Sequence, residues 1–565
     1  MQRQPPVTPS DEIDLYVRTY NSLLRSSGRV RVRAFEEAHA YSGSSLHPRA
    51  LSPEVDVSAF AYAAARLPQM MPSLDLLVLG QSHELFEAEG FMVRTWQTVK
   101  TRGRRRPLRW DGKRAVAVFI ASVSDIDDLV PIVTAYQIEW NKMHGRLRLA
   151  KDSLDRAKAA ELLALDEAGM DNLEAAFGRG QLDAGLAALA AHDCNLTVQM
   201  LASSYSQFQR AAQRWWSGIE PVYLREKEKG QSRRRPVYFV SSNTHAIANL
   251  VGGYAWTHQE DIMAFIRETN PEGLASDLEE ALAQQDEARI AGLLHYVLRG
   301  YIHADPTGER MTKVRAFEAE NGLVHVTEPG HIDVDAQVID LSKIDPSRLD
   351  PRLLVPGLER ITRSNALIVN IDYPLGMAAY HLLSRLGQGV GEVRGVYVMG
   401  KAATLNGRVG DVMLSGAVFD EHTRNTFLVD NAFRAKQVQQ YLRHGTVFDN
   451  QSALTVRSAF LQNKNYMNAF YRDGYTVLEM EAGPFLAAVY ELVSPTRVST
   501  NEIVNLAGRI PFEVGIVHYA SDTPYSRRQE LLSKSLSYFG VDATYACAIA
   551  IVRRIFEQEL ARVIR

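Results

Sequence analysis

Two acidic residues in the second half of the chain stand where a short β-type run ends. Glu481 follows Tyr475–Met480, and Asp522 follows Val514–Ala520. A carboxylate at the end of such a run can accept hydrogen bonds from two vicinal hydroxyls, such as those of a ribose, while Met480 packs on the apolar face of the sugar. Alternatively, Glu481 is an acid at the N-terminus of the next helix, where the helix dipole favours it. Glu481 alone does not decide between these interpretations.

Asp522 is preceded by Ser521 and followed by Thr523-Pro524. Cleavage of the N-glycosidic bond of a purine requires a proton for the departing base, because the oxocarbenium-like transition state pushes electrons into the ring. A carboxyl group with a raised pKa, held at a strand end in a dry pocket, is suited to donate that proton. The alternative is an aspartate that caps a turn before Pro524, which is the commoner role for this pattern.

The elements that must position these two acids alternate along the chain. Val237–Val240 reads as a buried strand, the polar turn Ser241–His245 follows it, and a helix is expected at Ala246–Val251. From Ala366 onward strands alternate with helices, which predicts a largely parallel or mixed sheet. An open α/β sheet binds its ligand at the carboxyl ends of its strands, where both acids would lie.

Residues 1–230 are expected to form a separate, largely helical α+β domain of unknown role. The predicted elements are strands at Leu74–Leu79 and Ala115–Ile120 and helices within Asp125–His144, Lys151–Ala191 and Thr197–Trp216. The polar stretch Arg225–Arg235 predicts a linker to a second domain, residues 231–565. That domain is expected to carry a helical insertion at about 259–301 and no long element between Asp333 and Pro356.

Composition describes a soluble globular protein, with 46% hydrophobic and 23% charged residues. A net charge of −3 gives no reason to expect nucleic acid as a partner, and the densest basic run, Lys100–Arg106, favours a solvated loop over a phosphate contact. Cys194 and Cys547 are too few for a disulfide framework or a zinc site and fit a reducing cytosol. Because no run of about 18 apolar residues occurs, we expect no membrane span and a cytoplasmic location.

The order of these motifs resembles the nucleoside phosphorylase and nucleosidase superfamily. Met480-Glu481 matches the Met-Glu motif of that family, Ser521-Asp522 its Ser-Asp motif, and Gly400 with Leu405–Asp411 its Gly-x-Ala-Gly-x-Leu and Gly-Asp segments. The closing helix also resembles the family's C-terminal helix, with one apolar stripe made of Tyr545, Ile549, Val552 and Phe556. AMP nucleosidases, which carry a large extra N-terminal domain, look most similar. The resemblance covers roughly the last 330 residues.

The resemblance implies a phosphorylase-type α/β fold, with a mixed central sheet flanked by helices. It implies that Asp522 protonates the base and that Glu481 holds the ribose hydroxyls. The other substrate-binding residues that it implies are Met480, Gly400, Ser521, Val447 and Phe448. A homo-oligomer is the default for the family, and no cofactor is expected. The scattered histidines have no metal-ligand spacing, so no metal is expected either.

The chain departs from the family pattern at two turns. Asp372-Tyr373 stand where the family usually has a Gly-x-Gly turn, and Ala403 replaces a second glycine. An acid at Asp372 would repel phosphate by about 1–4 kcal/mol, which favours water as the nucleophile. The base that activates this water is then His245 or Asp372, between which the sequence does not choose.

Three functions follow, in order of preference. The first is hydrolysis of the N-glycosidic bond of a purine nucleoside or nucleotide, the second a non-catalytic nucleoside-binding sensor or assembly protein, and the third a phosphorylase. If the substrate carries a phosphate, Arg408, Arg457 or the N-terminal arginines are the candidate cations. The glycine-rich run Gly387–Gly391 is expected to end a helix rather than to cradle a phosphate.

Overall fold

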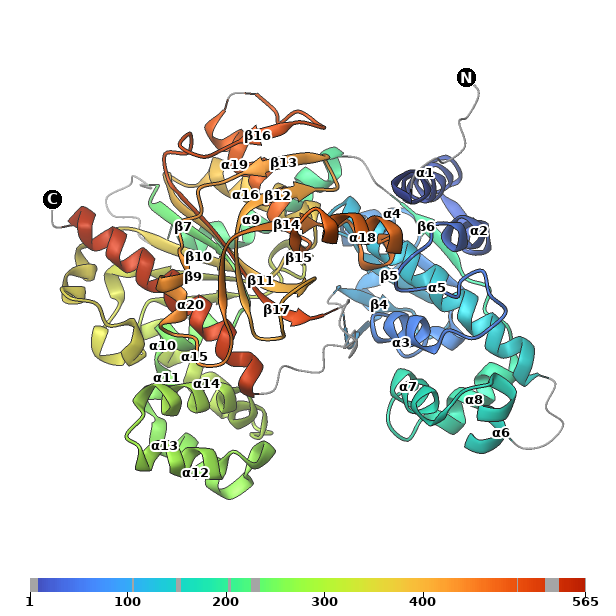
Figure 1. Ribbon diagram of the computed structural model, residues 1–565, viewed down its shortest axis with the longest axis horizontal. Coiled ribbons are helices and arrows are strands. Elements are labelled where there is room, and N and C mark those ends of the chain that lie inside the picture. The colour runs from blue at the N-terminus through green and yellow to red at the C-terminus, as the bar shows by residue number, and fades with distance from the viewer. Residues whose placement is uncertain are drawn as a thin grey trace.

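The computed structural model shows two β-sheets with helices packed on their faces (Figure 1). It describes residues 9–103, 106–148, 154–201, 205–224, 234–494, 496–523 and 538–563. Most of the predicted linker, residues 225–233, and Pro524 lie outside these ranges.

The first sheet has six described strands in the order β1-β6-β2-β5-β4-β3. They are β1 (Arg29–Arg31), β2 (Leu76–Gly80), β3 (Gln97–Val99), β4 (Leu108–Trp110), β5 (Ala115–Phe119) and β6 (Thr197–Met200). The central strand β2 runs parallel to both β5 and β6. Helix α5 (Val123–Leu147) begins just after β5, where Ser122 and Asp125 form a capping box. The two predicted strands and the helix after them are confirmed.

The helices of this region are α1 (Pro9–Ser27), α2 (Arg33–Tyr41), α3 (Val57–Ala65), α4 (His83–Ala88), α5, α6 (Arg156–Leu163), α7 (Glu167–Phe177), α8 (Leu182–Ala191) and α9 (Tyr205–Tyr223). The helix predicted at Thr197–Trp216 is wrong in its first part, because Thr197–Met200 is strand β6. Val198 and Met200 alternate inward along this strand and are buried between β1 and β2. Pairing with distant strands therefore decided the structure of this short segment.

The second sheet has eleven described strands, in the order β16-β13-β12-β14-β15-β11-β7-β10-β9-β8, with β17 joining β11 to β12. They are β7 (Pro236–Ser241), β8 (Leu323–Val326), β9 (Ala336–Asp340), β10 (Leu367–Ile371), β11 (Glu392–Thr404), β12 (Val412–Asp420), β13 (Asn425–Leu428), β14 (Val447–Thr455), β15 (Tyr475–Glu479), β16 (Ile503–Asn505) and β17 (Glu513–Asp522). The sheet is mixed, since β10, β7, β11 and β17 are parallel neighbours while β11 and β15 are antiparallel.

Helices cover both faces of this sheet (Figure 1). They are α10 (Ala246–Gly252), α16 (Met377–Gly389), α17 (Ala435–Gln439), α18 (Lys464–Arg472), α19 (Ala482–Val493) and α20 (Tyr538–Val563). One face packs against α9, α16 and α19, and the other against α10 and α20. Tyr545, Ile549, Val552 and Phe556 of α20 are all buried, which confirms the predicted apolar stripe. The run Gly387–Gly391 ends α16, as predicted.

The helical insertion is longer than its prediction. It comprises α11 (Tyr254–Thr257), α12 (Gln259–Thr269), α13 (Ala275–Ala283), α14 (Glu287–His303) and α15 (Glu309–Glu320). These helices bury a core of their own. The segment 333–356, predicted to hold no long element, contains β9, which is buried because it pairs antiparallel with β8 and β10.

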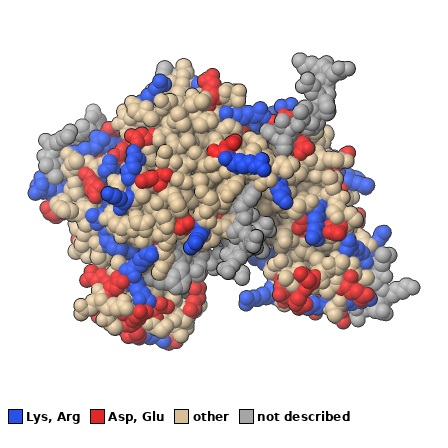
Figure 2. All heavy atoms as spheres, viewed as in Figure 1, with Lys and Arg blue, Asp and Glu red and all other residues tan. Residues whose placement is uncertain are grey.

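The fold class is mixed α/β, with a mixed central sheet flanked by helices and preceded by an α+β region, as predicted. The two regions share packing, since Phe460 and Leu461, from a short 3-10 helix in the second half of the chain, are buried in the core of the first. Figure 2 shows basic and acidic side chains interspersed over one face of the molecule. Among the described residues, no helix is long and apolar enough to cross a membrane.

Candidate active site

The parallel strands of the second sheet bring the ends of four segments to one edge. Because β10, β7, β11 and β17 are successive parallel neighbours, their carboxyl ends lie together. Asp372 follows β10, the turn that ends in His245 follows β7, and Asp522 ends β17. Asp522 pairs in register with Ala403 of β11, three residues after Gly400. The carboxyl ends of these strands therefore form the common sheet edge at which the sequence predicts the site.

A cavity of about 1010 Å³ opens at this edge. The second sheet and its loops line it with His245, Asp372, Tyr373, Lys401, Glu481 and Tyr519. The region of the first sheet contributes Gln81, Arg106 and Asp125, and the helical insertion contributes His295, Arg299 and Arg315. Three predicted residues from distant segments, His245, Asp372 and Glu481, are thus brought into one cavity. Residues from all three parts of the chain form its wall.

Asp522 itself does not line the described cavity, but it interacts with Lys401, which does and which the sequence analysis did not propose as a functional residue. Lys401 is exposed, but partial desolvation by the surrounding protein lowers its pKa, and the negative charge of Asp522 opposes that effect. The hydroxyl of Ser521 donates a hydrogen bond to Asp522 Oδ2 at 2.8 Å. Asp522 therefore lies close enough to Lys401 for their charges to interact.

Glu481 lies between the end of β15 at Glu479 and the start of α19 at Ala482, as the N-cap residue of the helix, so it lies at the strand–helix junction that the sequence predicts. A second acid, Glu479, fixes this junction: its Oε2 accepts hydrogen bonds from the backbone N–H groups of Glu481 and Ala482, both at 2.7 Å. Thr455 donates a hydrogen bond to its other carboxylate oxygen. Burial raises the pKa of Glu479 to about 7, despite these hydrogen bonds. Sequence reasoning missed Glu479, although it precedes the Met-Glu motif directly.

Gly400 lies beside a buried histidine. His518 is its register partner on β17, and a Cβ atom at Gly400 would lie 3.6 Å from the His518 ring and 3.7 Å from that of Tyr373. Burial lowers the pKa of His518 to about 4, and its Nε2 lies 3.8 Å from Glu479 Oε2. The sequence offered a signal, because His518 alternates with Ile516 and Ala520 and is thus a lone histidine on an apolar face of the strand.

The turn after β10 is built around Asp372 and Tyr373. Asp372 is buried, and its Oδ1 accepts a hydrogen bond from the backbone N–H of Tyr373 at 3.0 Å. The phenol oxygens of Tyr373 and Tyr519 lie 3.0 Å apart, and burial raises the pKa of Tyr373 well above its ordinary value. Tyr373 thus fills space beside Gly400 and fixes the cavity wall.

The turn after β10 ends on Gly376, which contacts helix α5 in the region of the first sheet. Gly376 has a φ of 52°, and a Cβ atom there would come within 2.2 Å of Ser124 Oγ at the start of α5. Ser124 Oγ accepts a hydrogen bond from the backbone N–H of Met377 at 2.9 Å and lies 3.1 Å from His422 Nε2. The N-termini of α5 and α16 therefore meet beside the cavity.

The other predicted substrate contacts do not line the described cavity; they are Gly400, Ser521, Met480, Val447 and Phe448. Met480 packs against an apolar cluster that includes Leu405 and Phe470. Val447 is buried in the core under α20, and Phe448 is 36% exposed. Both stand at the start of β14, beside the beginning of β12.

The candidate phosphate-binding arginines have different surroundings. Arg457 is held among Glu421, Asp127 and Asp14, whose charges raise its pKa against the effect of burial. Arg106 ends the basic run that was expected to be a solvated loop, but it is buried and paired with Asp125 and Asp128. Arg408 is exposed.

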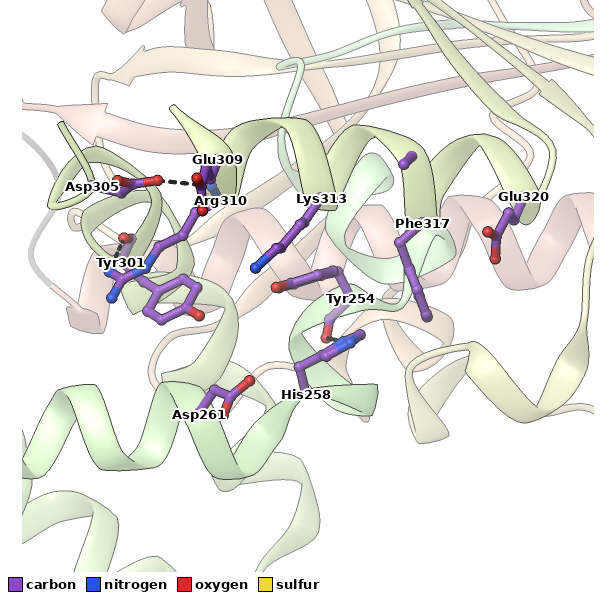
Figure 3. A pocket seen from close by; sticks show the side chains of 11 residues that line it. Tyr254, His258, Asp261, Tyr301, Asp305, Glu309, Arg310, Lys313, Phe317 and Glu320 are labelled. Carbon is purple, nitrogen blue, oxygen red and sulfur yellow. Dashed lines mark hydrogen bonds between the residues drawn. The ribbon is translucent and has the colours of Figure 1, made fainter. Parts of the chain in front are cut away.

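A second pocket, of about 550 Å³, lies within the helical insertion (Figure 3). Side chains face each other across it: Arg310, Lys313 and Phe317 on α15, and Tyr254, His258 and Tyr301 opposite. Asp261 and Glu309 add negative charge. It contains no predicted site residue, and its charges of both signs do not select one ligand class. Among the described residues, no group of three or more His, Cys, Asp or Glu could hold a metal ion.

The site and fold define an α/β protein with a ligand-sized cavity at the carboxyl edge of its main sheet. A family model described as "Family of unknown function (DUF6909)" matches residues 32–557, so the chain belongs to that family. No curated protein matches the chain.

Solved structures with similarity to this chain include nucleoside-processing proteins. One is described as a candidate methylthioadenosine nucleosidase from Weissella paramesenteroides, 12% identical, with 44% of this chain and 94% of that chain covered and a TM-score of 0.28. An AMP nucleosidase from Bacteroides thetaiotaomicron is 12% identical over 43% and 84%, with a TM-score of 0.27. A uridine phosphorylase from Schistosoma mansoni is 11% identical over 35% and 74%, with a TM-score of 0.26. Because these values are low, we infer function from the site itself.

Proposed function

We propose that this protein hydrolyses the N-glycosidic bond of a purine nucleoside or nucleotide and releases the free base, as a member of the nucleoside phosphorylase and nucleosidase superfamily. One observation carries the proposal: His245, Asp372, Lys401 and Glu481, which come from four separate segments, line a single cavity. Its volume of about 1010 Å³ is ample for a nucleotide.

The proposed roles follow from the chemistry of these groups. Asp522 donates a proton to the ring nitrogen of the base as the C–N bond breaks, and water supplies the oxygen that bonds to the sugar carbon. Lys401 stabilises the carboxylate that remains on Asp522. Glu481 accepts hydrogen bonds from the sugar hydroxyls, with its backbone fixed by Glu479.

Activation of water requires a base on the other side of the sugar. Asp372 and His245 both line the cavity. We propose that one of them takes the proton, and the variants Asp372→Asn and His245→Ala separate them. The variant that lacks the base should lose base release by about 10²-fold or more, while the other should retain most of it.

Hydrolysis is preferred to phosphorolysis because of Asp372, whose carboxylate would oppose phosphate by about 1–4 kcal/mol. A second candidate function is nucleoside binding without turnover. Tyr373 favours it, since this half-buried side chain, whose phenol oxygen lies 3.0 Å from that of Tyr519, fills the turn where the resembled family has glycine.

The test is release of free base from a panel of purine nucleosides and nucleotides, with and without phosphate. We expect phosphate-independent release, lowered about 10²–10⁴-fold in Asp522→Asn. Phosphate-dependent release would establish the phosphorylase instead. Binding of a nucleoside by calorimetry without release of base from any member would establish the binding module.

A further inference from the structure

The helical insertion contributes a buried histidine to the cavity. His295 lies in the middle of α14, its side chain is 1% exposed, and it lines the cavity that also contains Glu481 and Lys401. Its ring stacks on Tyr545 of α20, with centroids 5.2 Å apart and planes inclined by 13°. Tyr545 accepts a hydrogen bond from Asn249 at 2.8 Å. The imidazole is therefore fixed in one orientation by packing.

Asp350 determines which nitrogen of His295 carries the proton. His295 Nε2 lies 2.7 Å from Asp350 Oδ2. Burial raises the pKa of Asp350, but hydrogen bonds from Arg352 and His295 outweigh it and hold that pKa well below its ordinary value. Because an ionised carboxylate only accepts hydrogen bonds, Nε2 must be the donor. Burial also lowers the pKa of His295, so the ring is neutral near pH 7 and Nδ1 carries a lone pair.

The Nδ1 lone pair of His295 accepts no hydrogen bond from any described residue. Among the described residues, Nδ1 of His295 is buried and has no hydrogen-bond partner. A buried acceptor without a partner is costly, and such a group beside a cavity is best explained by a donor that a ligand brings.

We propose that His295 Nδ1 accepts a hydrogen bond from an N–H group on the ligand, and that this group is the exocyclic amine of the base. The inference rests on the proposed function and deepens it, because it selects an amino-substituted purine. Glu481 stands at the strand–helix junction where the sugar hydroxyls would bind. His295 lines the cavity from the insertion, beside Tyr545. Because Glu481 would bind the sugar, we assign the base to the side of His295, where its exocyclic amine is the N–H donor.

Two substitutions separate the two ring nitrogens. His295→Gln places an amide nitrogen near the position of Nε2, so it can still donate to Asp350, but leaves no acceptor at the position of Nδ1. His295→Asn places an amide oxygen near the position of Nδ1 and gives up the contact with Asp350. His381→Gln is the matched control, since His381 is also buried with Nδ1 unpartnered among the described residues, but it stands on α16 and outside the described cavity wall.

The experiment compares adenosine with purine riboside, which has the same sugar but no amine on the ring. Calorimetry should show that wild type binds adenosine about 10-fold more tightly than purine riboside. His295→Gln should reduce this preference to within about 2-fold, while His295→Asn and the control His381→Gln retain it. Urea unfolding of each variant shows that the fold is intact.

The outcomes separate this inference from the proposed function. Equal affinity of wild type for the two nucleosides, or a preference that survives in His295→Gln, overturns the inference, and release of base from both nucleosides then leaves the proposed function standing. Failure of wild type to bind or cleave either nucleoside overturns both.

Discussion

At the carboxyl edge of the first sheet, the charged groups beside the cavity neutralise one another. Arg106 is buried between Asp125 and Asp128 and forms an ion pair with each. At the carboxyl edge of the second sheet, Asp372 and Glu481 line the same cavity, and Lys401 lines it beside Asp522. Both edges are ends of parallel strands, so their geometry is alike. The two edges differ in burial: Arg106 is buried in its ion pairs, whereas Lys401 and His245 are exposed where they line the cavity.

The physical reason is the cost of burying charge. A buried ion whose charge is fully paired has no free hydrogen-bonding capacity with which to bind a ligand. An ionisable group that faces a cavity keeps hydrogen-bonding capacity, and its protonation state responds to its surroundings. The predictions below test this division, from the largest expected effect to the smallest.

Arg106→Met should lower the free energy of unfolding by about 3–5 kcal/mol, because it leaves the carboxylates of Asp125 and Asp128 buried without their partner. Urea denaturation measures the effect. The control is Arg94→Met, since Arg94 pairs with Glu84 and Glu87 near the surface and should cost no more than about 1 kcal/mol. If Arg106→Met lost base release but kept the wild-type free energy of unfolding, Arg106 would act on the substrate rather than stabilise the cavity wall.

Glu479 should make stability depend on pH. Its folded pKa of about 7 is raised above the ordinary value of 4.5, so the stability that it contributes is complete below pH 4.5 and is lost as the pH rises to 7. Relative to Glu479→Gln, wild type should lose about 3 kcal/mol across this range. Urea melts at several pH values measure it, with the exposed Glu89→Gln as control. A constant difference between wild type and Glu479→Gln would contradict the raised pKa.

Glu481→Gln should lower kcat/KM for a ribonucleoside about 10–100-fold, because hydrogen bonds to a charged acceptor are lost. The 2′-deoxy analogue, which lacks one hydroxyl, should be affected less. Base release with both substrates measures the difference. An equal loss for the two would show that Glu481 acts through the fold and not through the sugar.

Lys313→Ala should change neither activity nor stability appreciably. Lys313 is exposed and lies in the pocket of the insertion, among charges of both signs. We expect base release within about 2-fold of wild type and an unfolding free energy within about 0.5 kcal/mol. A larger loss of activity would mean that the pocket in Figure 3 communicates with the sheet edge.

Much of the second sheet could be predicted because its strands are short apolar runs that carry their own signal. Val237–Val240 became β7, and the stripe of Tyr545 and Phe556 identified α20. The strand β6 could not be predicted in this way, since its four residues are stabilised by strands far away in sequence. Glu479 and His518 stand in patterns that the sequence shows, but their burial and their approach to each other are decided by the pairing of distant strands.

The sequence by itself determined the alternation of strands and helices, and it placed Asp372, Glu481 and Asp522 at or just beyond strand ends, where side chains meet at an edge. Only the tertiary structure decided what surrounds them. It buried Arg106 in ion pairs and brought His295 from the insertion to the cavity. The physical reason is that local periodicity records which face of an element is apolar, whereas partners of buried charges come from segments that are distant in the chain.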